Sequence, residues 1–162
     1  MNVYFGLGSN LGDRLKNLRD ALACLRTLGD ITACSDVYET EAWGGVPQPD
    51  YLNACVKASM PQCTPPYVLA DVKRFELELG RVTSVRWGAR KIDIDILLID
   101  DAVYRSDTLN VPHISIPDRL FVLVPLGEIV PEGWRHPVNG KTIREMTAGL
   151  EGEAWPVRVT GL

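Results

Sequence analysis

The segment 92–99, Ile-Asp-Ile-Asp-Ile-Leu-Leu-Ile, holds the pair of residues whose spacing points most directly to chemistry. Alternate side chains of a β-strand share a face, so Asp93 and Asp95 are expected to project side by side. Neighbouring carboxylates repel each other, and Mg²⁺ prefers carboxylate and water oxygens. The pattern indicates a cation site, although two aspartates on a solvated edge strand would look the same. We expect the opposite face to pack into the core through Ile92, Ile94, Ile96 and Leu98.

The loop before this strand, 81–91, is strongly basic and has the sequence RVTSVRWGARK. Its basic residues are Arg81, Arg86, Arg90 and Lys91. Phosphoryl transfer needs such groups, because arginines stabilise the charge that develops on phosphate oxygens and bind phosphate with two parallel hydrogen bonds. The loop therefore favours a phosphate site beside the acidic pair. The alternative is a basic turn that pairs with the aspartates without any ligand.

The glycine-rich segment 6–12, Gly-Leu-Gly-Ser-Asn-Leu-Gly, suggests phosphate binding but fails the stricter tests. It lacks the terminal Gly-Lys-Ser/Thr of a P-loop, and Leu11 stands at the last position of the GxGxxG dinucleotide motif. We therefore reject a Rossmann site here. The glycines instead indicate room for a flat ligand or close packing of a strand on a helix, and Ser9 or Asn10 could cap the following turn or helix.

Aromatic and amide side chains suggest a second ligand. Tyr51 and Asn53 share the polar face of a predicted strand, Trp43 and Trp87 lie in loops that contain glycine, and Phe121 begins a predicted helix. If these side chains converge, they would bind a flat heteroaromatic ring by stacking and by amide hydrogen bonds. Single aromatics in loops more often serve as packing caps.

Hydrophobic periodicity supplies the elements that must position these residues. Strands are expected over 2–8, 31–40, 51–60 and 92–99, and helices over 13–28 and 65–80. A hairpin near 102–104 and helices near 119–128 and 142–149 should follow. The order strand, helix, strand, strand, helix, strand predicts an α+β, ferredoxin-like βαββαβ core. We expect an antiparallel sheet with helices on both faces, in a single domain over residues 1–162.

Composition argues against several classes of protein. The 162 residues are 46% hydrophobic and 23% charged, which is typical of one globular domain rather than a disordered chain. Neither a membrane-spanning run nor a secretory signal pattern is apparent, so we expect a cytoplasmic protein without a membrane partner. The net charge of −4 argues against nucleic-acid binding. The four cysteines form no CxxC pair, and we expect buried thiols rather than zinc ligands.

The run 86–97, RWGARKIDIDIL, resembles the signature of the 6-hydroxymethyl-7,8-dihydropterin pyrophosphokinase family of folate synthesis. Further matches to the family follow in order at 6–13, 49–54, 76–81, 111–113 and 119–126. The resemblance implies a ferredoxin-like enzyme that transfers the terminal pyrophosphoryl group of ATP to the hydroxymethyl oxygen of the reduced pterin and releases AMP. Its partners would be ATP and the pterin, and we expect it to act as a monomer.

The resemblance also implies roles for individual residues. Asp93 and Asp95 would bind two Mg²⁺ ions, and Arg81 and Arg90 would join them as catalytic residues. The pterin pocket would be formed by Thr40, Trp43, Tyr51, Asn53, Trp87 and Phe121. The nucleotide would contact Glu76, Arg81, Arg90, Ile96, His113 and Arg119.

The chain departs from the family pattern at four positions, Glu41, Trp43, Thr108 and Ile114. The first two bear on the pterin pocket and the last two on nucleotide affinity. Two other functions stay open: another ATP-dependent phosphotransferase that acts on a hydroxymethyl heterocycle, and a non-catalytic ligand-binding module on the same fold.

Overall fold

A computed structural model describes residues 1–42, 47–61, 64–81, 89–150 and 152–162. The strands of its main sheet are β1 (Asn2–Ser9), β2 (Asp30–Cys34), β3 (Asp36–Thr40), β4 (Tyr51–Ser59), β5 (Asp93–Ile99) and β8 (Val157–Gly161). The α-helices are α1 (Arg14–Leu25), α2 (Pro65–Glu78), α3 (Leu120–Gly127) and α4 (Ile143–Ala148). A hairpin, β6 (Tyr104–Arg105) and β7 (Asn110–Val111), and the 3₁₀ turn η1 (Ile116–Asp118) lie between β5 and α3.

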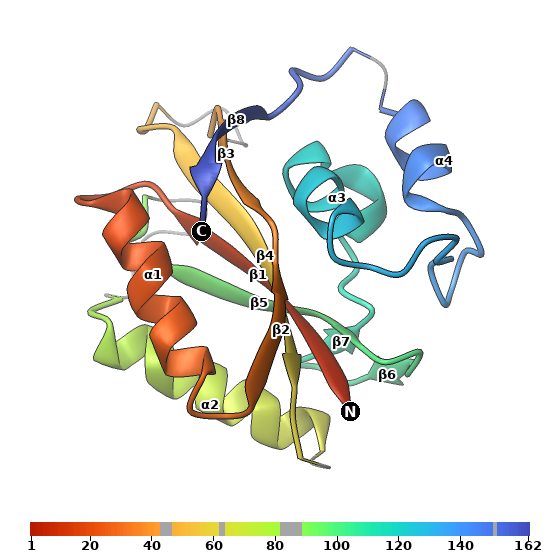
Figure 1. Ribbon diagram of the computed structural model, residues 1–162, viewed down its shortest axis with the longest axis horizontal. Coiled ribbons are helices and arrows are strands. Elements are labelled where there is room, and N and C mark those ends of the chain that lie inside the picture. The colour runs from red at the N-terminus through yellow and green to blue at the C-terminus, as the bar shows by residue number, and fades with distance from the viewer. Residues whose placement is uncertain (43–46, 62–63, 82–88, 151) are drawn as a thin grey trace.

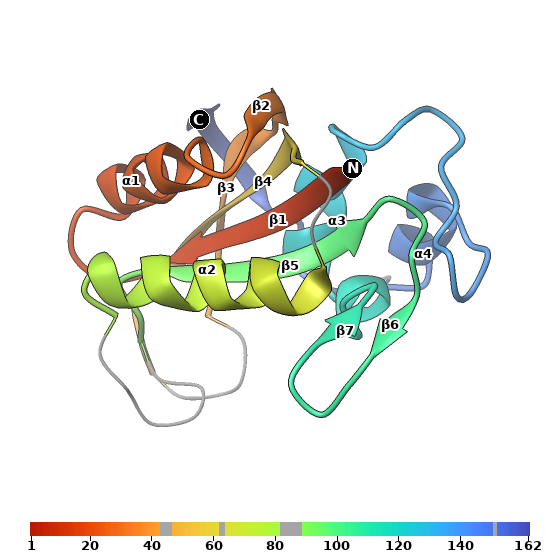
Figure 2. The same ribbon diagram turned by 90° about the horizontal axis from the view of Figure 1, so that it is seen from below.

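The sheet is antiparallel throughout and has the order β5–β1–β4–β3–β8. Strand β2, which precedes β3 in the chain, also pairs with β4. Helices α1 and α2 cover one face, while α3, with α4 packed against it, covers part of the other (Figures 1 and 2). This arrangement confirms the predicted α+β, ferredoxin-like core with helices on both faces. The central position of β1 places its glycines between the strands that carry the candidate site.

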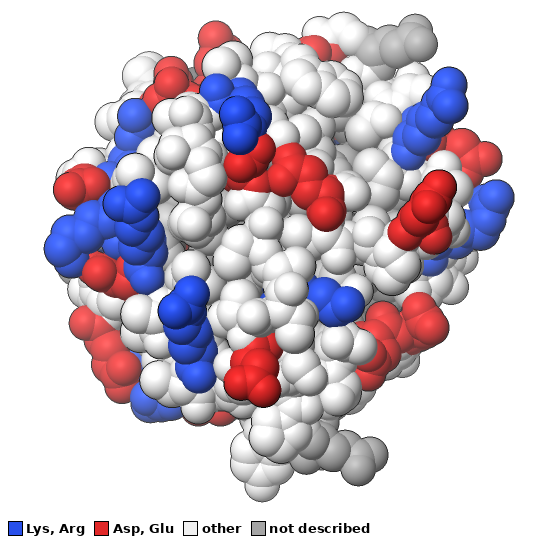
Figure 3. Space-filling model, viewed as in Figure 1, with Lys and Arg blue, Asp and Glu red and all other residues white. Residues whose placement is uncertain are grey.

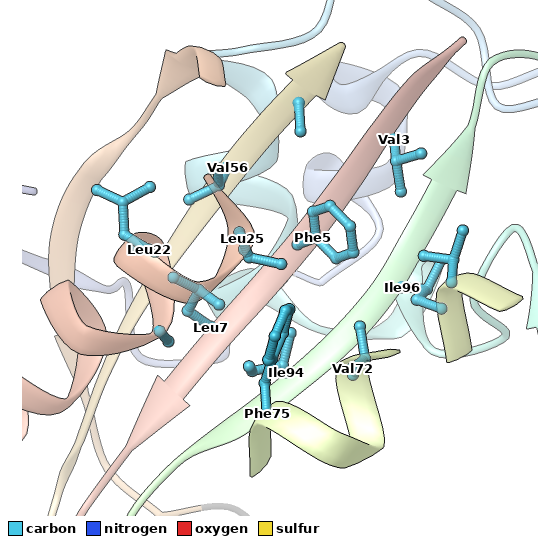
Figure 4. Packing of buried hydrophobic residues seen from close by; sticks show 14 of the residues in the cluster. Val3, Phe5, Leu7, Leu22, Leu25, Val56, Val72, Phe75, Ile94 and Ile96 are labelled. Atoms are coloured by element: carbon cyan, nitrogen blue, oxygen red, sulfur yellow. The ribbon is translucent and has the colours of Figure 1, made fainter. Parts of the chain in front are cut away.

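The face covered by α1 and α2 holds the larger hydrophobic core. In α1, Leu18, Leu22 and Leu25 recur at helical spacing and are buried. Figure 4 shows side chains of these two helices directed toward the apolar residues of the sheet, among them Phe5 and Ile94. The two helices and this core fill one face of the sheet, and the cleft described below lies on the opposite face.

Helix α3 is held on that opposite face by an acidic residue at its end. The Glu128 carboxylate accepts a hydrogen bond from the Asp36 backbone N–H at 2.7 Å and another from the Tyr38 hydroxyl. Because both partners belong to β3, these contacts secure one end of α3 to the sheet. The other end, which begins at Leu120, carries Phe121 toward the candidate site.

The predicted strand over 31–40 is two strands separated by Ser35. The Ser35 N–H donates to the Cys55 carbonyl at 2.9 Å, and its hydroxyl accepts from the Cys55 N–H at 2.8 Å. The side chain thus replaces part of the strand pairing at the break. Strand β8 was not predicted, although Val157 and Val159 alternate with polar residues; the strand is short, and most of its residues are exposed at the edge of the sheet.

A β-bulge in β5 overturns one prediction about the core. Phe5 of β1 pairs with Ile96 and Tyr4 pairs with Leu98, which leaves Leu97 without a partner on β1. The extra residue reverses the alternation beyond it. Leu98 therefore packs on the α3 side of the sheet, and its expected place on the face of Ile96 was wrong.

Helix length, surface charge and cysteine exposure test three expectations from composition. Among the residues described, no helix is both long and apolar enough to cross a membrane. On the face shown in Figure 3, Lys and Arg are interspersed with Asp and Glu. The expected burial of the cysteines holds for Cys55, whereas Cys24 is half-buried and Cys34 is exposed, and Cys63 lies outside the described residues.

Candidate active site

The register of three strands builds the floor of the candidate site on the α3 side of the sheet. Two rows run across β4, β1 and β5, namely Asn53–Gly8–Asp93 and Cys55–Gly6–Asp95. A Cβ atom on Gly8 would lie 3.4 Å from the Asn53 Oδ1 and 3.6 Å from the Tyr51 ring. Gly8 therefore leaves a stretch of floor without a side chain between the Asn53 amide and the Asp93 carboxylate, whereas Gly6 lies against the Leu97 side chain.

A cleft lies above this floor. Its empty volume is about 820 Å³, and this figure includes space that is open to solvent. The expected site residues that line it are Thr40, Tyr51, Asn53, Arg90, Asp93, Asp95, Arg119 and Phe121. The cleft thus brings most of the expected pterin side chains and the acidic pair into one space. Trp43, Trp87 and Arg86 lie outside the described residues, so their expected roles stay predictions.

The end of the cleft next to β3 is suited to a flat polar ring. Asn53 is buried, and its Nδ2 donates to the Thr40 hydroxyl at 2.8 Å, which leaves Oδ1 beside Gly8. Burial raises the pKa of Tyr51, so its phenol stays neutral. The Arg119 guanidinium lies 5.5 Å from the centre of the Phe121 ring. These groups supply hydrogen bonds at an edge and aromatic surface for stacking.

At the other end of the cleft, the two ends of the basic loop meet on one carboxylate. The Arg81 Nη1 lies 2.9 Å from the Asp93 Oδ1, and the Arg90 Nη1 lies 2.6 Å from the Asp93 Oδ2. Both guanidinium groups therefore pair with Asp93. These contacts place two cationic side chains beside the cleft, where they could bind an anion.

Arg81 is positioned from below by a buried glutamate. Glu76 of α2 is only 2% exposed, and its carboxylate forms an ion pair with Arg81 and one with Lys73 at 2.8 Å. It also accepts the Ile94 backbone N–H at 2.9 Å, between the two aspartates of β5. Glu76 thus lies beneath the arginine and not along the lining of the cleft.

Asp95 lies half-buried in the cleft and has an unusual protonation state. Removal from water and then the negative charge of Asp93 raise the pKa of Asp95 to about 7. The group therefore holds a proton near neutrality as long as no cation compensates it.

This proton predicts how the stability of the protein depends on pH when EDTA removes divalent cations. The pKa of Asp95 is about 7 in the folded state and near 3.8 in the unfolded state, so its stabilising contribution is present at low pH and lost as the pH rises toward 7. We expect Asp95→Asn to raise the free energy of unfolding relative to the unsubstituted protein by about 2–3 kcal/mol more at pH 8 than at pH 5.

Urea denaturation at the two pH values measures this difference. The matched control is Asp101→Asn, which alters an exposed aspartate that follows β5, and it should show no pH-dependent difference. Parallel pH profiles for Asp95→Asn and the unsubstituted protein would contradict the assignment of the proton to Asp95.

The donor set of the cleft suits Mg²⁺ better than zinc. Among the described residues, no group of three or more His, Cys, Asp or Glu side chains could hold a metal ion, so the acidic pair has no further ligand of these types. Mg²⁺ is commonly held by one or two carboxylates, with water and substrate phosphates as the remaining ligands, whereas a protein zinc site uses three or four side chains. Asp93 and Asp95 fit the first pattern.

Two expected nucleotide contacts occupy different environments. The Ile96 side chain is buried in the core against α1 and α2, so only its main chain can approach the cleft. His113 is half-buried after β7, and its Nδ1 accepts the Ser115 N–H at 3.2 Å. Burial and the charge of Arg119 lower the pKa of His113, so the neutral ring carries its proton on Nε2 as a donor.

The structure adds cleft residues that the sequence reasoning missed, among them Gln48, Cys55 and Val122. Cys55 could have been found, because it alternates with Asn53 along the same strand face. Of the departures from the family pattern, Glu41 lines the cleft, whereas Thr108 and Ile114 are exposed away from it.

The turn after β1 also differs from expectation. The side chain that caps α1 is Asp13, which accepts the Lys16 N–H at 3.0 Å, and not Ser9 or Asn10. The Ser9 hydroxyl instead donates to the Lys91 carbonyl at 2.6 Å.

Comparison with known proteins agrees with this geometry. A family model described as 7,8-dihydro-6-hydroxymethylpterin-pyrophosphokinase (HPPK) matches residues 4–131. The chain is 42% identical over 143 residues to the 2-amino-4-hydroxy-6-hydroxymethyldihydropteridine pyrophosphokinase of Aquifex aeolicus, with 88% of each protein covered. It is 38% identical over 155 residues to the Synechocystis protein of that name, and the match covers 94% of this chain and 78% of the relative.

Solved structures show the same fold at lower sequence identity. The HPPK-DHPS of Plasmodium falciparum, solved as a triple mutant with STZ-DHP, is similar to this chain with a TM-score of 0.71 and 15% identity. The similarity covers 92% of this chain and 43% of the Plasmodium chain, so the present chain spans less than half of that protein.

Proposed function

Because this chain belongs to the 7,8-dihydro-6-hydroxymethylpterin-pyrophosphokinase family, we propose that its cleft holds the pterin beside β3 and β4 and the ATP phosphates beside β5. The chain is a pyrophosphokinase of folate biosynthesis. The observation that carries the proposal is the row Asn53–Gly8–Asp93, which sets an amide and a carboxylate on either side of a bare strand.

The pterin lies on the glycine floor in this proposal. Asn53 and Thr40 hydrogen-bond the amide edge of the ring, since their own 2.8 Å contact fixes the orientation of the Asn53 amide. Tyr51 and Phe121 line the cleft and supply aromatic surface for the ring. Trp43 and Trp87 remain expected members of this pocket on the basis of the family resemblance.

Asp93 and Asp95 would hold the two Mg²⁺ ions. When bound, Mg²⁺ neutralises the phosphate oxygens and aligns them for transfer. Arg81 and Arg90, which pair with Asp93 in the absence of a ligand, then become available to the phosphates. Glu76 keeps its ion pair with Arg81 and so holds this arginine beside the cleft while Arg81 exchanges Asp93 for phosphate. Arg119 and the Nε2 of His113 are further donors at this end.

The reaction itself depends on placement and charge. The pterin hydroxyl oxygen bonds to the β-phosphorus, the bond between that phosphorus and the oxygen bridging to the α-phosphorus breaks, and AMP leaves. The loose transition state needs little help from a general base, so the side chains act by orienting the two substrates and by stabilising charge on the transferred group.

We further propose that the protein acts as a monomer, because residues of one chain line both ends of the cleft, and that it acts in the cytoplasm, as the sequence predicts. Analytical ultracentrifugation tests the monomer.

The proposal is tested by mixing the protein with ATP, Mg²⁺ and 6-hydroxymethyl-7,8-dihydropterin and following the nucleotide product. We expect AMP formation that depends on the pterin and is abolished in the double variant Asp93→Asn/Asp95→Asn. Formation of ADP would favour another phosphotransferase reaction. Tight ligand binding without turnover would favour a non-catalytic binding module.

A further inference from the structure

Glu41 follows the last residue of β3 and lines the cleft at the end next to that strand. It is one of the positions at which the chain departs from the family pattern, and the scheme proposed above gives it no role. Among the residues that the structure describes, its carboxylate forms neither a hydrogen bond nor an ion pair. An acceptor with both oxygens available therefore borders the space assigned to the pterin.

The acidic side chain two residues earlier is engaged elsewhere. Glu39 pairs with Arg14 at 2.7 Å, at the start of α1 and so on the other face of the sheet. Thr40, between the two glutamates, turns toward the cleft, where its hydroxyl accepts from the Asn53 Nδ2 at 2.8 Å. Glu41 thus extends the polar end of the cleft beyond Thr40, whereas Glu39 helps to hold α1.

The shape of the pterin decides which of its groups reaches this end of the cleft. The carbon that bears the hydroxymethyl group, C6, and the carbon that bears the amino group, C2, lie at opposite ends of the long axis of the bicyclic ring. The proposed transfer requires the hydroxymethyl oxygen beside Asp93 and Asp95 of β5, and β1 and β4 lie between β5 and β3 in the sheet. With that oxygen beside β5, the 2-amino group is directed toward β3 and Glu41.

The hydrogen bonds already made at this end leave a place for a further acceptor. The pterin presents two neighbouring donors, the ring N3–H and the 2-amino group. Because the Asn53 Nδ2 is directed to Thr40, the Asn53 Oδ1, which lies beside Gly8, can accept from one of these donors. The Glu41 carboxylate can accept from the other, and an ionised acceptor makes a stronger hydrogen bond than a neutral one.

We propose that Glu41 is a specificity-determining residue that accepts a hydrogen bond from the 2-amino group and so selects 2-amino-4-oxo pteridines over 2,4-dioxo pteridines. The inference rests on the proposed function for the identity and orientation of the substrate. A 2-oxo group would bring a second acceptor against the carboxylate, and neither acceptor would have a donor. Selection therefore combines binding of the amine with rejection of the oxygen analogue.

The test compares 6-hydroxymethyl-7,8-dihydropterin with 6-hydroxymethyl-7,8-dihydrolumazine, which carries oxygen in place of the 2-amino group. AMP formation with ATP and Mg²⁺ gives kcat/KM for each compound, and the ratio of the two values is the preference for the amine. We expect a preference of about a hundredfold or more in the unsubstituted protein and about tenfold less in Glu41→Gln. The glutamine amide can turn its NH₂ group toward a 2-oxo group or its oxygen toward an amine.

Glu41→Ala separates recognition of the amine from a role in catalysis. Loss of one contact made equally in the ground state and the transition state should raise KM for the pterin about tenfold and leave kcat within about threefold. Because Glu41 is exposed, the variant should keep the fold.

Glu39→Gln is the matched control. It removes the same charge from the same segment, but its side chain pairs with Arg14 and does not line the cleft. It should leave both the preference and the KM for the pterin within about threefold of the unsubstituted protein.

An unchanged preference in Glu41→Gln overturns the proposal, and this includes the case in which the lumazine gives no AMP with either protein. A preference below about tenfold in the unsubstituted protein overturns it too, as does an equal loss of preference in Glu39→Gln, since the effect would then be one of net charge. A fall in kcat of Glu41→Ala without a rise in KM is the result of a merely structural role and also contradicts it. The proposed function fails separately, if the unsubstituted protein forms no AMP with the pterin.

Discussion

Asp95→Ala is expected to lower turnover at least a hundredfold at saturating ATP and pterin, equivalent to about 2.7 kcal/mol of transition-state stabilisation. The reason is that Asp95 supplies one of the two neighbouring carboxylates of β5 that line the cleft, and Asp93 alone cannot organise two ions. Steady-state rates of AMP formation, measured over a range of Mg²⁺ concentrations, give the result.

The loss of activity should not reflect unfolding. Removal of Asp95 relieves its repulsion with Asp93 and ends the desolvation that raises its pKa to about 7, so the variant should be no less stable at pH 8. Asp101→Ala, at an exposed position just after β5, is the matched control and should keep near-normal turnover. A near-normal rate in Asp95→Ala would remove the assignment of the metal pair to this strand.

Arg90→Ala is expected to lower the rate of the chemical step about a hundredfold while leaving the dissociation constant of ATP within a few-fold of its original value. The Arg90 guanidinium pairs with the Asp93 carboxylate at 2.6 Å. ATP binding therefore exchanges one anionic partner for another and changes the free energy little. The charge that develops during transfer is new, so the arginine contributes chiefly at that stage.

Single-turnover quenched-flow measurements give the chemical step, and calorimetry gives the dissociation constant. Arg90→Lys should recover only part of the rate, because a lysine lacks the planar fork that binds two phosphate oxygens. The matched control is Arg74→Ala on α2, whose arginine is half exposed and pairs with Asp71 and Glu78. A weaker affinity for ATP in Arg90→Ala with an unchanged chemical step would contradict the assigned role.

Local patterns in the sequence predicted the parts of the site that depend on strand alternation. Asp93 and Asp95 share a face because nothing interrupts the pleat between them, and both line the cleft. The same reasoning failed at Leu98, since the bulge at Leu97 depends on how β5 pairs with a distant strand. Alternation can be read within a segment, whereas a change of register is a property of two segments.

Long-range partners were beyond the reach of the sequence for the same reason. Nothing near Glu76 in the chain indicates that it lies beneath Arg81 and accepts the N–H of Ile94. The family resemblance pointed to eight of the residues that line the cleft but could not say that Ile96 turns its side chain to the core. For Asn10, helix-capping preferences suggested a local role, while its hydrogen-bond partners Gln48 and Arg90 precede β4 and β5.

Helix α3 covers only part of its face of the sheet, and the cleft begins where the helix does. Over Gly8, the residues that the structure describes form no second layer like the one that α1 and α2 form on the opposite face. A bound pterin would supply that layer and would form part of the protein interior for as long as it stays bound. Resistance of the enzyme to heat and proteolysis in the cell is therefore tied to the supply of the metabolite that it consumes.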